Sequence, residues 1–255
     1  MAVFTALCYL LGACGPLPGG VQIGRPPEVA QVKASLEARR LAVQNFVMQG
    51  EVQIESPEGE MIGDHLIRGA YPDRLRAEIM GPFGRPLLLL VHDAGRLTVI
   101  AYRENRVYVG PASRRNLARF LGLALEPTQV YALLTGSAPY LAGSVEEVSM
   151  AAPGQVRLTL AEPALGIKET LVANLTNYAV REAWLAQRDG GYSLTCQFSD
   201  FMPFLSWAYP RTLSVEDGED RKLKLINDTL TLNGPLDGRV FEVSPPAGLE
   251  VRWLP

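Results

Sequence analysis

The stretch that decides the fold reads RLRAEIMGPFGRPLLLLVHDAGRLTVIAYRENRVYVG and occupies residues 74–110. It contains four short segments rich in apolar residues: Arg74–Met80, Leu87–Val91, Arg96–Tyr102 and Arg106–Val109. Segments of this length, bounded by turn residues, are typical of β-strands. The turns between them, such as Asp93–Gly95, are too short for a crossover helix. We therefore predict that neighbouring strands pair antiparallel, as a meander.

Similar segments lie on both sides of this stretch. Upstream, the period changes to two after Phe46, and a strand is predicted at Met61–Gly69. Downstream, a second meander begins near Gln155, and residues 199–210 are interpreted as an apolar loop within it. Its predicted strands are Val156–Ala161, Ile167–Ala173, Tyr178–Ala186, Tyr192–Phe198, Arg211–Val215, Lys222–Leu232 and Val240–Val243.

Three helices are predicted among the strands. The first lies within residues 28–45, where apolar residues recur at helical spacing. The second is Arg114–Leu121, with Ser113 as its N-cap and Gly122 at its C-terminal end. The third is Pro127–Leu134, which ends before Gly136. These elements predict a mainly β protein with helices (α+β), in which a curved antiparallel sheet forms an incomplete barrel under a helical lid.

The N-terminus carries a separate signal. An apolar run from Ala2 ends in Leu11-Gly12-Ala13-Cys14, the pattern of a bacterial lipoprotein signal, and it is too short to span a bilayer. We therefore expect residues 1–13 to be a signal peptide and Cys14 to carry the lipid. Residues 14–27, rich in Gly and Pro, would form a flexible tether, and residues 28–255 one domain. The alternative is a buried N-terminal strand or helix with an incidental cysteine, and no Lys or Arg precedes Cys14.

Composition excludes some classes of partner. The 255 residues carry a net charge of −3, which gives no basic field for nucleic acid. Of the three cysteines, Cys8 would leave with the signal and Cys14 would be acylated, so Cys196 has no disulfide partner and is interpreted as a small core residue. We expect a monomer without cofactors.

No catalytic set is recognisable. His65 and His92 lie on different predicted strands, without metal-ligand spacing, and are interpreted as surface or hydrogen-bonded histidines. The acidic pairs Glu146-Glu147 and Glu219-Asp220 fall in predicted polar loops, where solvation explains them. We expect a protein that is not an enzyme; a periplasmic hydrolase is the least favoured class.

An apolar cavity is the functional feature that the pattern favours. A concave half-barrel covered by helices can hold a hydrophobic ligand, although ordinary core packing would use the same residues. The candidate lining residues are Val52, Ile54, Leu75, Ile79, Leu97, Val99, Leu117, Phe120, Leu133 and Leu134.

Several pieces of the chain resemble the LolA/LolB lipoprotein-carrier superfamily, and the LolB-like outer-membrane lipoproteins in particular. They are Arg74–Arg76 with Gly81–Gly84 and Leu87–Val91, Pro127–Pro139, Tyr209–Leu213 with Lys222–Leu225, and Phe241–Val251. The resemblance implies a half-barrel that receives the acyl chains of other lipoproteins. It also implies that an apolar residue on the Pro-containing loop contacts the membrane. The matching residues here are Pro82 and Phe83; a core-facing Phe83 is the alternative.

The resemblance implies a lipid-anchored protein of the outer membrane that faces the periplasm and helps to place lipoproteins in that membrane. Its partners would be the acyl chains of lipoproteins or lipids, the outer membrane, and a periplasmic LolA-like carrier. Gly15, where an Asp would favour inner-membrane retention, agrees with outer-membrane sorting. The alternative function is an envelope lipoprotein that uses the same fold as a protein-interaction module without lipid transfer.

Overall fold

The computed structural model describes residues 27–255, apart from 58, 123, 140–142, 192 and 219–220. The predicted signal peptide, Cys14 and nearly all of the predicted tether lie outside the described residues. The described elements are α1 Val29–Leu41, β1 Asn45–Ser56, β2 Gly59–Ala70, β3 Arg74–Met80, β4 Pro86–Asp93, β5 Arg96–Ala101, β6 Arg106–Pro111, α2 Arg114–Leu121, α3 Pro127–Leu134, β7 Ser144–Ala152, β8 Gln155–Glu162, β9 Ile167–Asn174, β10 Val180–Gln187, β11 Ser193–Phe204, β12 Trp207–Asp217, β13 Lys222–Leu232 and β14 Glu250–Trp253.

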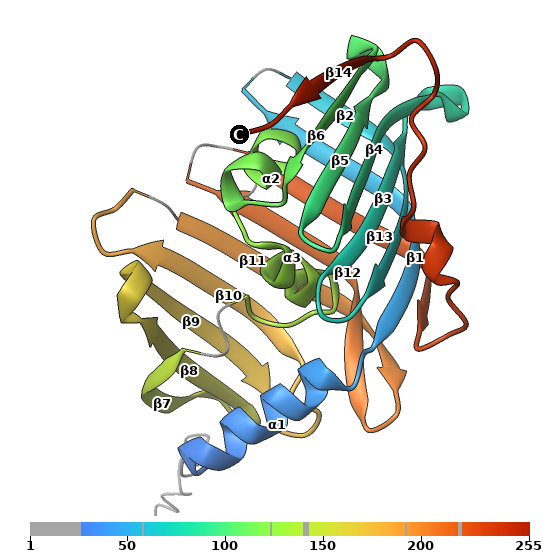
Figure 1. Ribbon diagram of the computed structural model, residues 1–255. Helices are drawn as coiled ribbons and strands as arrows, with labels where there is room; N and C mark the ends of the chain where they lie inside the picture. The colour runs from blue at the N-terminus through green and yellow to red at the C-terminus, as the bar shows by residue number, and fades with distance from the viewer. Residues whose placement is uncertain (1–26, 58, 123, 140–142, 192, 219–220) are drawn as a thin grey trace, which may run out of the picture.

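All fourteen described strands belong to one strongly curved sheet (Figure 1). Its order is β14-β6-β5-β4-β3-β2-β1-β13-β12-β11-β10-β9-β8-β7. Every neighbouring pair is antiparallel except β14 and β6, which run parallel. The sheet does not close, because β7 and β14 are its two edges. The predicted fold class, an incomplete antiparallel barrel with helices, is confirmed.

Glycines allow the sheet to bend sharply at β1 and β2. The register between β1 and β13 shifts at Gly50, and a Cβ atom there would overlap the carbonyl oxygen of Ile226. A Cβ atom at Gly63 would overlap the carbonyl oxygen of Met80 in the same way. Only a residue without a side chain lets the backbones approach so closely. These two positions help to turn a flat sheet into a concave one.

The concave face holds the main core, and α2 and α3 lie over it (Figure 1). The predicted helix ends are confirmed: the Ser113 side chain accepts a hydrogen bond from the Asn116 amide at 3.3 Å, and Gly122 adopts a left-handed conformation with φ +70°. Cys196 is fully buried in this core, where burial raises the pKa of its thiol. Its interpretation as a core residue is therefore confirmed.

Strands β4 to β6 are apolar on both faces, which explains the unbroken apolar run in β4. Their outer face forms a second core with Phe241, and the partly buried Val240, Val243 and Leu249 pack against it. We call residues 233–249 the C-terminal strap, since this segment crosses the outside of the sheet before β14 begins (Figure 1). The predicted strand at 240–243 is wrong, because a 3-10 helix spans Gly238–Phe241 there.

Two other predictions on the strands are corrected. Residues 199–210 are a hairpin of β11 and β12, not a loop. Strand β7 was not anticipated, and Glu146 and Glu147 lie on this edge strand, where Glu146 pairs with Lys168 at 3.3 Å. Glu219 and Asp220 fall outside the described residues. Among the helices that the structure describes, none combines the length and the apolar composition needed to cross a bilayer.

Candidate functional site: an apolar cavity under a helical lid

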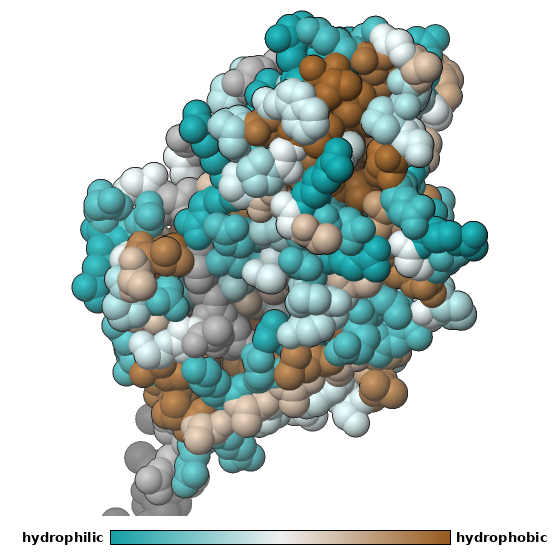
Figure 2. Space-filling view, viewed as in Figure 1, coloured by the Kyte–Doolittle hydropathy of each residue, from teal (hydrophilic) through white to brown (hydrophobic). Residues whose placement is uncertain are grey.

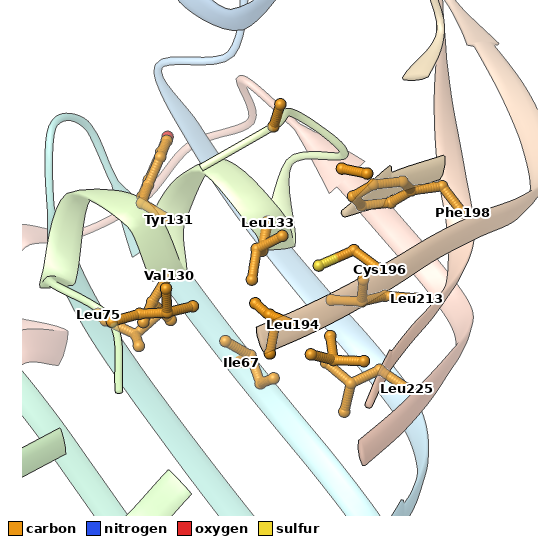
Figure 3. Packing of buried hydrophobic residues seen from close by; sticks show 14 of the residues in the cluster. Ile67, Leu75, Val130, Tyr131, Leu133, Leu194, Cys196, Phe198, Leu213 and Leu225 are labelled. Carbon is orange, nitrogen blue, oxygen red and sulfur yellow. The ribbon is translucent and has the colours of Figure 1, made fainter. Parts of the chain in front are cut away.

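An apolar cavity of about 80 Å³ lies between the concave face of the sheet and the two lid helices. Six central strands and both helices supply its walls. Figure 3 shows part of this lining, with side chains from β2, β3, α3, β12 and β13: Ile67, Leu75, Val130, Leu133, Leu213 and Leu225. All sixteen lining residues are apolar: Val52, Ile54, Ile67, Leu75, Ala77, Ile79, Leu88, Phe120, Leu121, Val130, Leu133, Leu134, Leu213, Val215, Leu223 and Leu225. The cavity itself therefore offers a ligand no side-chain hydrogen bond.

Seven of the ten candidate residues line the cavity: Val52, Ile54, Leu75, Ile79, Phe120, Leu133 and Leu134. The other three, Leu97, Val99 and Leu117, do not line it and are buried in the core. Their positions in the fold explain why these three side chains do not reach the cavity. Strand β5 lies two strands beyond β3 toward the β14 edge, and Leu117 lies on α2, one turn before Phe120.

Sequence reasoning missed the second wall of the cavity. Leu213, Val215, Leu223 and Leu225 come from β12 and β13, which stand beside β1 only because β1 pairs with β13. That pairing joins residues far apart in the chain, so no local sequence pattern predicts it. The alternation within β13 marks Leu223 and Leu225 as sharing one face, which is the only available sequence signal.

The cavity is small in this structure. Its volume is roughly half of the ~150 Å³ of an engineered cavity that binds benzene. A long acyl chain therefore needs the lid to move. The lid helix α3 is short and begins with a capping box, in which the Gln129 side chain accepts from the Glu126 amide at 2.8 Å. Val130 and Leu133 on this helix point into the cavity.

A buried arginine ties the end of the lid to the rest of the fold. Arg39 on α1 is 1% exposed and donates to the carbonyl oxygens of Gly136 at 2.9 Å and Ala208 at 2.8 Å. Burial lowers the pKa of Arg39 to about 10, so the guanidinium stays charged at neutral pH. Gly136 lies two residues after the last residue of α3, and Ala208 belongs to β12. Sequence analysis placed no weight on Arg39, because an arginine on an amphipathic helix is usually solvated.

Phe83 is the most exposed large apolar side chain among the described residues, with 99% of its surface accessible. It lies in a 3-10 turn, Pro82–Gly84, between β3 and β4, and has a left-handed backbone with φ 65°. Pro82 is exposed as well. Exposure of Phe83 was one of two alternatives, and the structure selects it over the core-facing one. The loop is closed by a hydrogen bond from the Gly81 amide to the Arg85 carbonyl at 2.9 Å.

The Phe83 loop lies at the same end of the sheet as the β1–β2 and β12–β13 hairpin loops, because successive antiparallel hairpins alternate between two ends. We call this end the loop rim. Leu88, which lines the cavity, comes four residues after the Pro82–Gly84 turn. In Figure 2, apolar side chains gather on the upper part of the molecule, over β4 to β6, while much of the remaining surface is hydrophilic.

Both histidines are buried and hydrogen bonded. His65 Nε2 lies 2.9 Å from Asn227 Oδ1, and burial lowers the pKa of His65. His92 Nδ1 lies 2.7 Å from the carbonyl oxygen of Asp73. No group of three or more His, Cys, Asp or Glu side chains among the described residues is arranged to hold a metal ion.

The fold of this chain is shared with solved bacterial proteins. A Vibrio parahaemolyticus domain described as an outer membrane lipoprotein-sorting protein matches with a TM-score of 0.59 and 13% identity, over 83% of this chain and 94% of its own. A LolA superfamily protein from Nitrosomonas europaea matches with 0.55 and 13%, over 84% and 97%. A DUF1329 family protein from Desulfovibrio piger matches with 0.60 and 10%, over 84% and 97%.

These similarities show that the chain has the fold of the LolA superfamily. No protein-family model matches the chain, and no curated protein matches it. At such low identities the similarity concerns the fold, and nothing in it singles out the LolB-like proteins within the superfamily.

Proposed function

We propose that this protein is a lipid-anchored carrier of the bacterial outer membrane, which binds acyl chains in its cavity and helps to place lipoproteins in that membrane. The observation that carries the proposal is the wholly apolar cavity beneath two short lid helices. The exposed Phe83 at the loop rim adds a contact for the membrane. The fold shared with a lipoprotein-sorting domain supports the same class of function.

The physical need for such a carrier is clear. Each acyl methylene removed from water contributes about 0.8 kcal/mol, so a lipid anchor with several chains does not cross an aqueous space unaided. A carrier needs an apolar site, a lid that opens and a route to the bilayer. It needs no catalytic group, and we propose that the protein is not an enzyme.

The proposed location of the protein in the cell envelope is inferred from its N-terminal sequence. Cys14 would carry the lipid that holds the protein at the outer membrane, facing the periplasm, and a LolA-like carrier would deliver the cargo. Lipid analysis of the mature N-terminus by mass spectrometry tests this part separately. If Cys14 is unmodified, the lipid-anchor part of the proposal fails. The role of the cavity is tested separately, by the experiment below.

Photo-crosslinking in cells tests the cargo. A photoreactive residue in place of Leu133, inside the cavity, should capture acylated N-terminal peptides of other lipoproteins. The same residue in place of Glu147, on the exposed edge strand, is the matched control and should capture none. Depletion of the protein should leave lipoproteins in the inner membrane or the periplasm. If the cavity captures no acylated molecule and sorting is unchanged, the protein-interaction alternative replaces this proposal.

A further inference from the structure

The C-terminal strand β14 is an open edge of the sheet (Figure 1). It pairs with β6 on one side, and none of the described strands pairs with its other side. All four of its residues are exposed, and two of them are large apolar side chains, Val251 at 49% and Trp253 at 76%. An open edge with exposed apolar side chains can template the addition of another strand.

The residues that follow β14 hold it firmly in an extended form. Leu254 is buried, and a Cβ atom on Gly110 of β6 would lie only 2.6 Å from the Leu254 Cβ atom. The Asn116 side chain on α2 donates to the Pro255 carbonyl oxygen at 3.0 Å. The edge is therefore already ordered as a strand, so a partner strand need not supply the free energy of ordering it.

The pairing with β6 determines which backbone groups of β14 remain available. The Glu250 amide donates to the Asn105 carbonyl oxygen at 3.4 Å. The Leu254 amide donates to the Val109 carbonyl oxygen at 2.8 Å. In a parallel pair, alternate residues of a strand direct their amide and carbonyl groups to the same neighbour. The odd-numbered residues of β14, with Val251 at the centre, therefore direct theirs to the open edge.

The two faces of β14 differ in chemistry. Glu250 and Arg252 lie on one face, where the Arg252 guanidinium Nη2 is 2.6 Å from Glu250 Oε1. Arg106 of β6 reaches the same carboxylate, with 3.1 Å between its Nε and Glu250 Oε2. Val251 and Trp253 lie on the other face, because successive side chains of a strand alternate. Each face therefore carries two side chains of one kind, charged or apolar.

We propose that β14 pairs antiparallel with β14 of a second copy of this chain, with Val251 at the two-fold centre. The two Val251 residues then exchange two backbone hydrogen bonds across the open edges. Glu250 of each copy stands opposite Arg252 of the other, which gives two ion pairs between the copies. On the apolar face, Trp253 of each copy stands opposite Leu249 of the other.

The charges and the backbone groups select this register. A centre at position 252 would set the two Arg252 side chains against each other, and a centre at position 250 would oppose the two Glu250 side chains. A centre at Trp253 leaves Arg252 opposite Leu254. A centre between two residues sets each outward-directed residue against one whose backbone groups are used on β6. Of the registers centred on β14, only the one at Val251 pairs opposite charges.

The other edge of the sheet, β7, lacks these properties. It carries two adjacent like charges, Glu146 and Glu147, and its pairing with β8 contains two register shifts. Charge and irregularity both protect an edge strand from pairing. Strand β14 pairs with β6 without a shift, and its two charges are opposite in sign. The edge suited to a second copy is therefore β14.

Sedimentation equilibrium over a concentration series tests the charge pairing. The full chain with Cys8→Ser and Cys14→Ser is used, so that neither a lipid nor a disulfide at these positions joins two copies. Glu250→Arg and Arg252→Glu each set like charges opposite each other, and each should weaken self-association about tenfold. A mixture of the two variants restores opposite charges at both positions. The mixed pair should associate at least as tightly as the wild type.

A substitution at the centre tests the backbone pairing. Val251→Pro removes the amide that points to the open edge and leaves the hydrogen bonds to β6 in place, so it should abolish self-association. Val251→Thr keeps the amide and the β-branched shape and is the matched control, with an expected affinity within about threefold of the wild type. Circular dichroism melting curves establish that both variants fold.

Disulfide cross-linking in the same chain tests the register. Val251→Cys should form a linked dimer under mild oxidation, because hydrogen-bonded residues of an antiparallel pair have Cα atoms about 5.5 Å apart. Trp253→Cys replaces a more exposed residue on the same face, but the two copies of position 253 are offset by four residues, about 14 Å along the strands. It should link much less. The native Cys196 is fully buried and should not contribute.

Three outcomes would overturn the proposal. The first is a wild-type protein that remains the monomer expected from the sequence at concentrations up to about 1 mM. The second is a dimer that withstands Val251→Pro, which would place the interface elsewhere. The third is cross-linking at position 253 as efficient as at position 251, which would exclude the register. The acyl-binding cavity has its own tests, and these outcomes leave it unaffected.

Discussion

Tyr209 donates a hydrogen bond of 2.7 Å to the main-chain carbonyl oxygen of Arg39, while the Arg39 guanidinium lies 4.5 Å from the centre of the Tyr209 ring. The two residues thus hold each other through a hydrogen bond and a cation–π contact. They join α1 to β12, and the guanidinium also reaches the carbonyl of Gly136 after α3. One buried charge therefore connects the N-terminal helix, the sheet and the end of the lid.

Removing that charge should destabilise the fold strongly. Arg39→Leu leaves the buried carbonyls of Gly136 and Ala208 without their donors, and we expect a loss of about 2–4 kcal/mol in the free energy of unfolding. Tyr209→Phe removes one hydrogen bond and should cost about 1 kcal/mol. Urea unfolding followed by circular dichroism measures both values.

The neighbouring arginine provides the matched control. Arg40 pairs with Glu37 on the partly exposed side of the same helix, so Arg40→Leu should cost under about 1 kcal/mol. Equal losses for the Arg39 and Arg40 variants would contradict the role assigned to the buried network.

Acidification should destabilise the protein through His65. Burial lowers the pKa of His65 in the folded state, so the unfolded chain, with a pKa of about 6.5, binds the proton first. In that pH range the unfolded state holds more protons, and the free energy of unfolding falls as the pH decreases below about 6.5. The fall continues down to the folded pKa. His65→Gln keeps a side chain that can bond Asn227 and should flatten this part of the profile; an unchanged slope would rule out His65 as its source.

Phe83→Glu should preserve folding and impair delivery to membranes. The side chain is almost fully exposed, so the substitution removes little packing, but a carboxylate at the tip opposes insertion into a bilayer. We expect at least about a tenfold loss in the rate of lipoprotein transfer to liposomes. Thermal unfolding should show a midpoint close to that of the wild type.

Leu205→Glu is the control for this substitution. Leu205 is 76% exposed and also has a left-handed backbone, but its β11–β12 hairpin lies at the end of the sheet opposite the loop rim. Its transfer rate should match the wild type. If both variants reduce the transfer rate equally, the effect comes from losing any exposed apolar side chain at a hairpin tip. The proposed membrane contact of Phe83 would then be wrong.

Widening the cavity should lower the free energy of unfolding and increase the uptake of apolar ligands. Leu133→Ala removes a buried side chain from the lid and should cost about 2–5 kcal/mol in the free energy of unfolding. The larger hollow should take up more of a small apolar probe such as benzene than the wild-type cavity does. Ligand-detected NMR measures the uptake. Leu160→Ala, in the core but outside the cavity lining, controls for loss of stability alone.

The strap should be released by a single substitution. Phe241 is buried against the outer face of β4 to β6, and the Arg74 guanidinium lies 4.4 Å from its ring centre. Phe241→Ala should cost about 3–5 kcal/mol and expose residues 233–249 to proteases. Limited proteolysis with mass spectrometry locates the new cleavage sites. Unchanged protection of this segment would show that Phe241 is not its main attachment.

Much of the fold follows from local pattern. The short apolar segments and turns in residues 74–110 and the cap at Ser113 are short-range signals, and the structure agrees with both. The β11–β12 hairpin was hidden because Pro203 and Pro210 interrupt an aromatic segment, and proline argues against a strand. Strand β7 was hidden by two register shifts, which break its alternation.

The site was less predictable for a different reason. Its first wall comes from strands that are neighbours in sequence, and residues such as Val52 and Ile79 could be assigned from their spacing alone. Leu213 and Leu225 face them only after β13 has paired with β1. The burial of Arg39 has the same origin, since its partners Gly136 and Ala208 are distant in the chain. Local periodicity reports which face a residue lies on, but not what stands opposite.

The C-terminal strap also bears on the order in which the molecule is completed. A chain synthesised from its N-terminus contains β4 to β6 well before Phe241 has been added, and the strap does not cover their apolar outer face until then. During that interval the apolar outer face of these three strands, out of the fourteen described, can aggregate or bind holding chaperones. Completion of the fold therefore waits until almost all of the described residues have been synthesised.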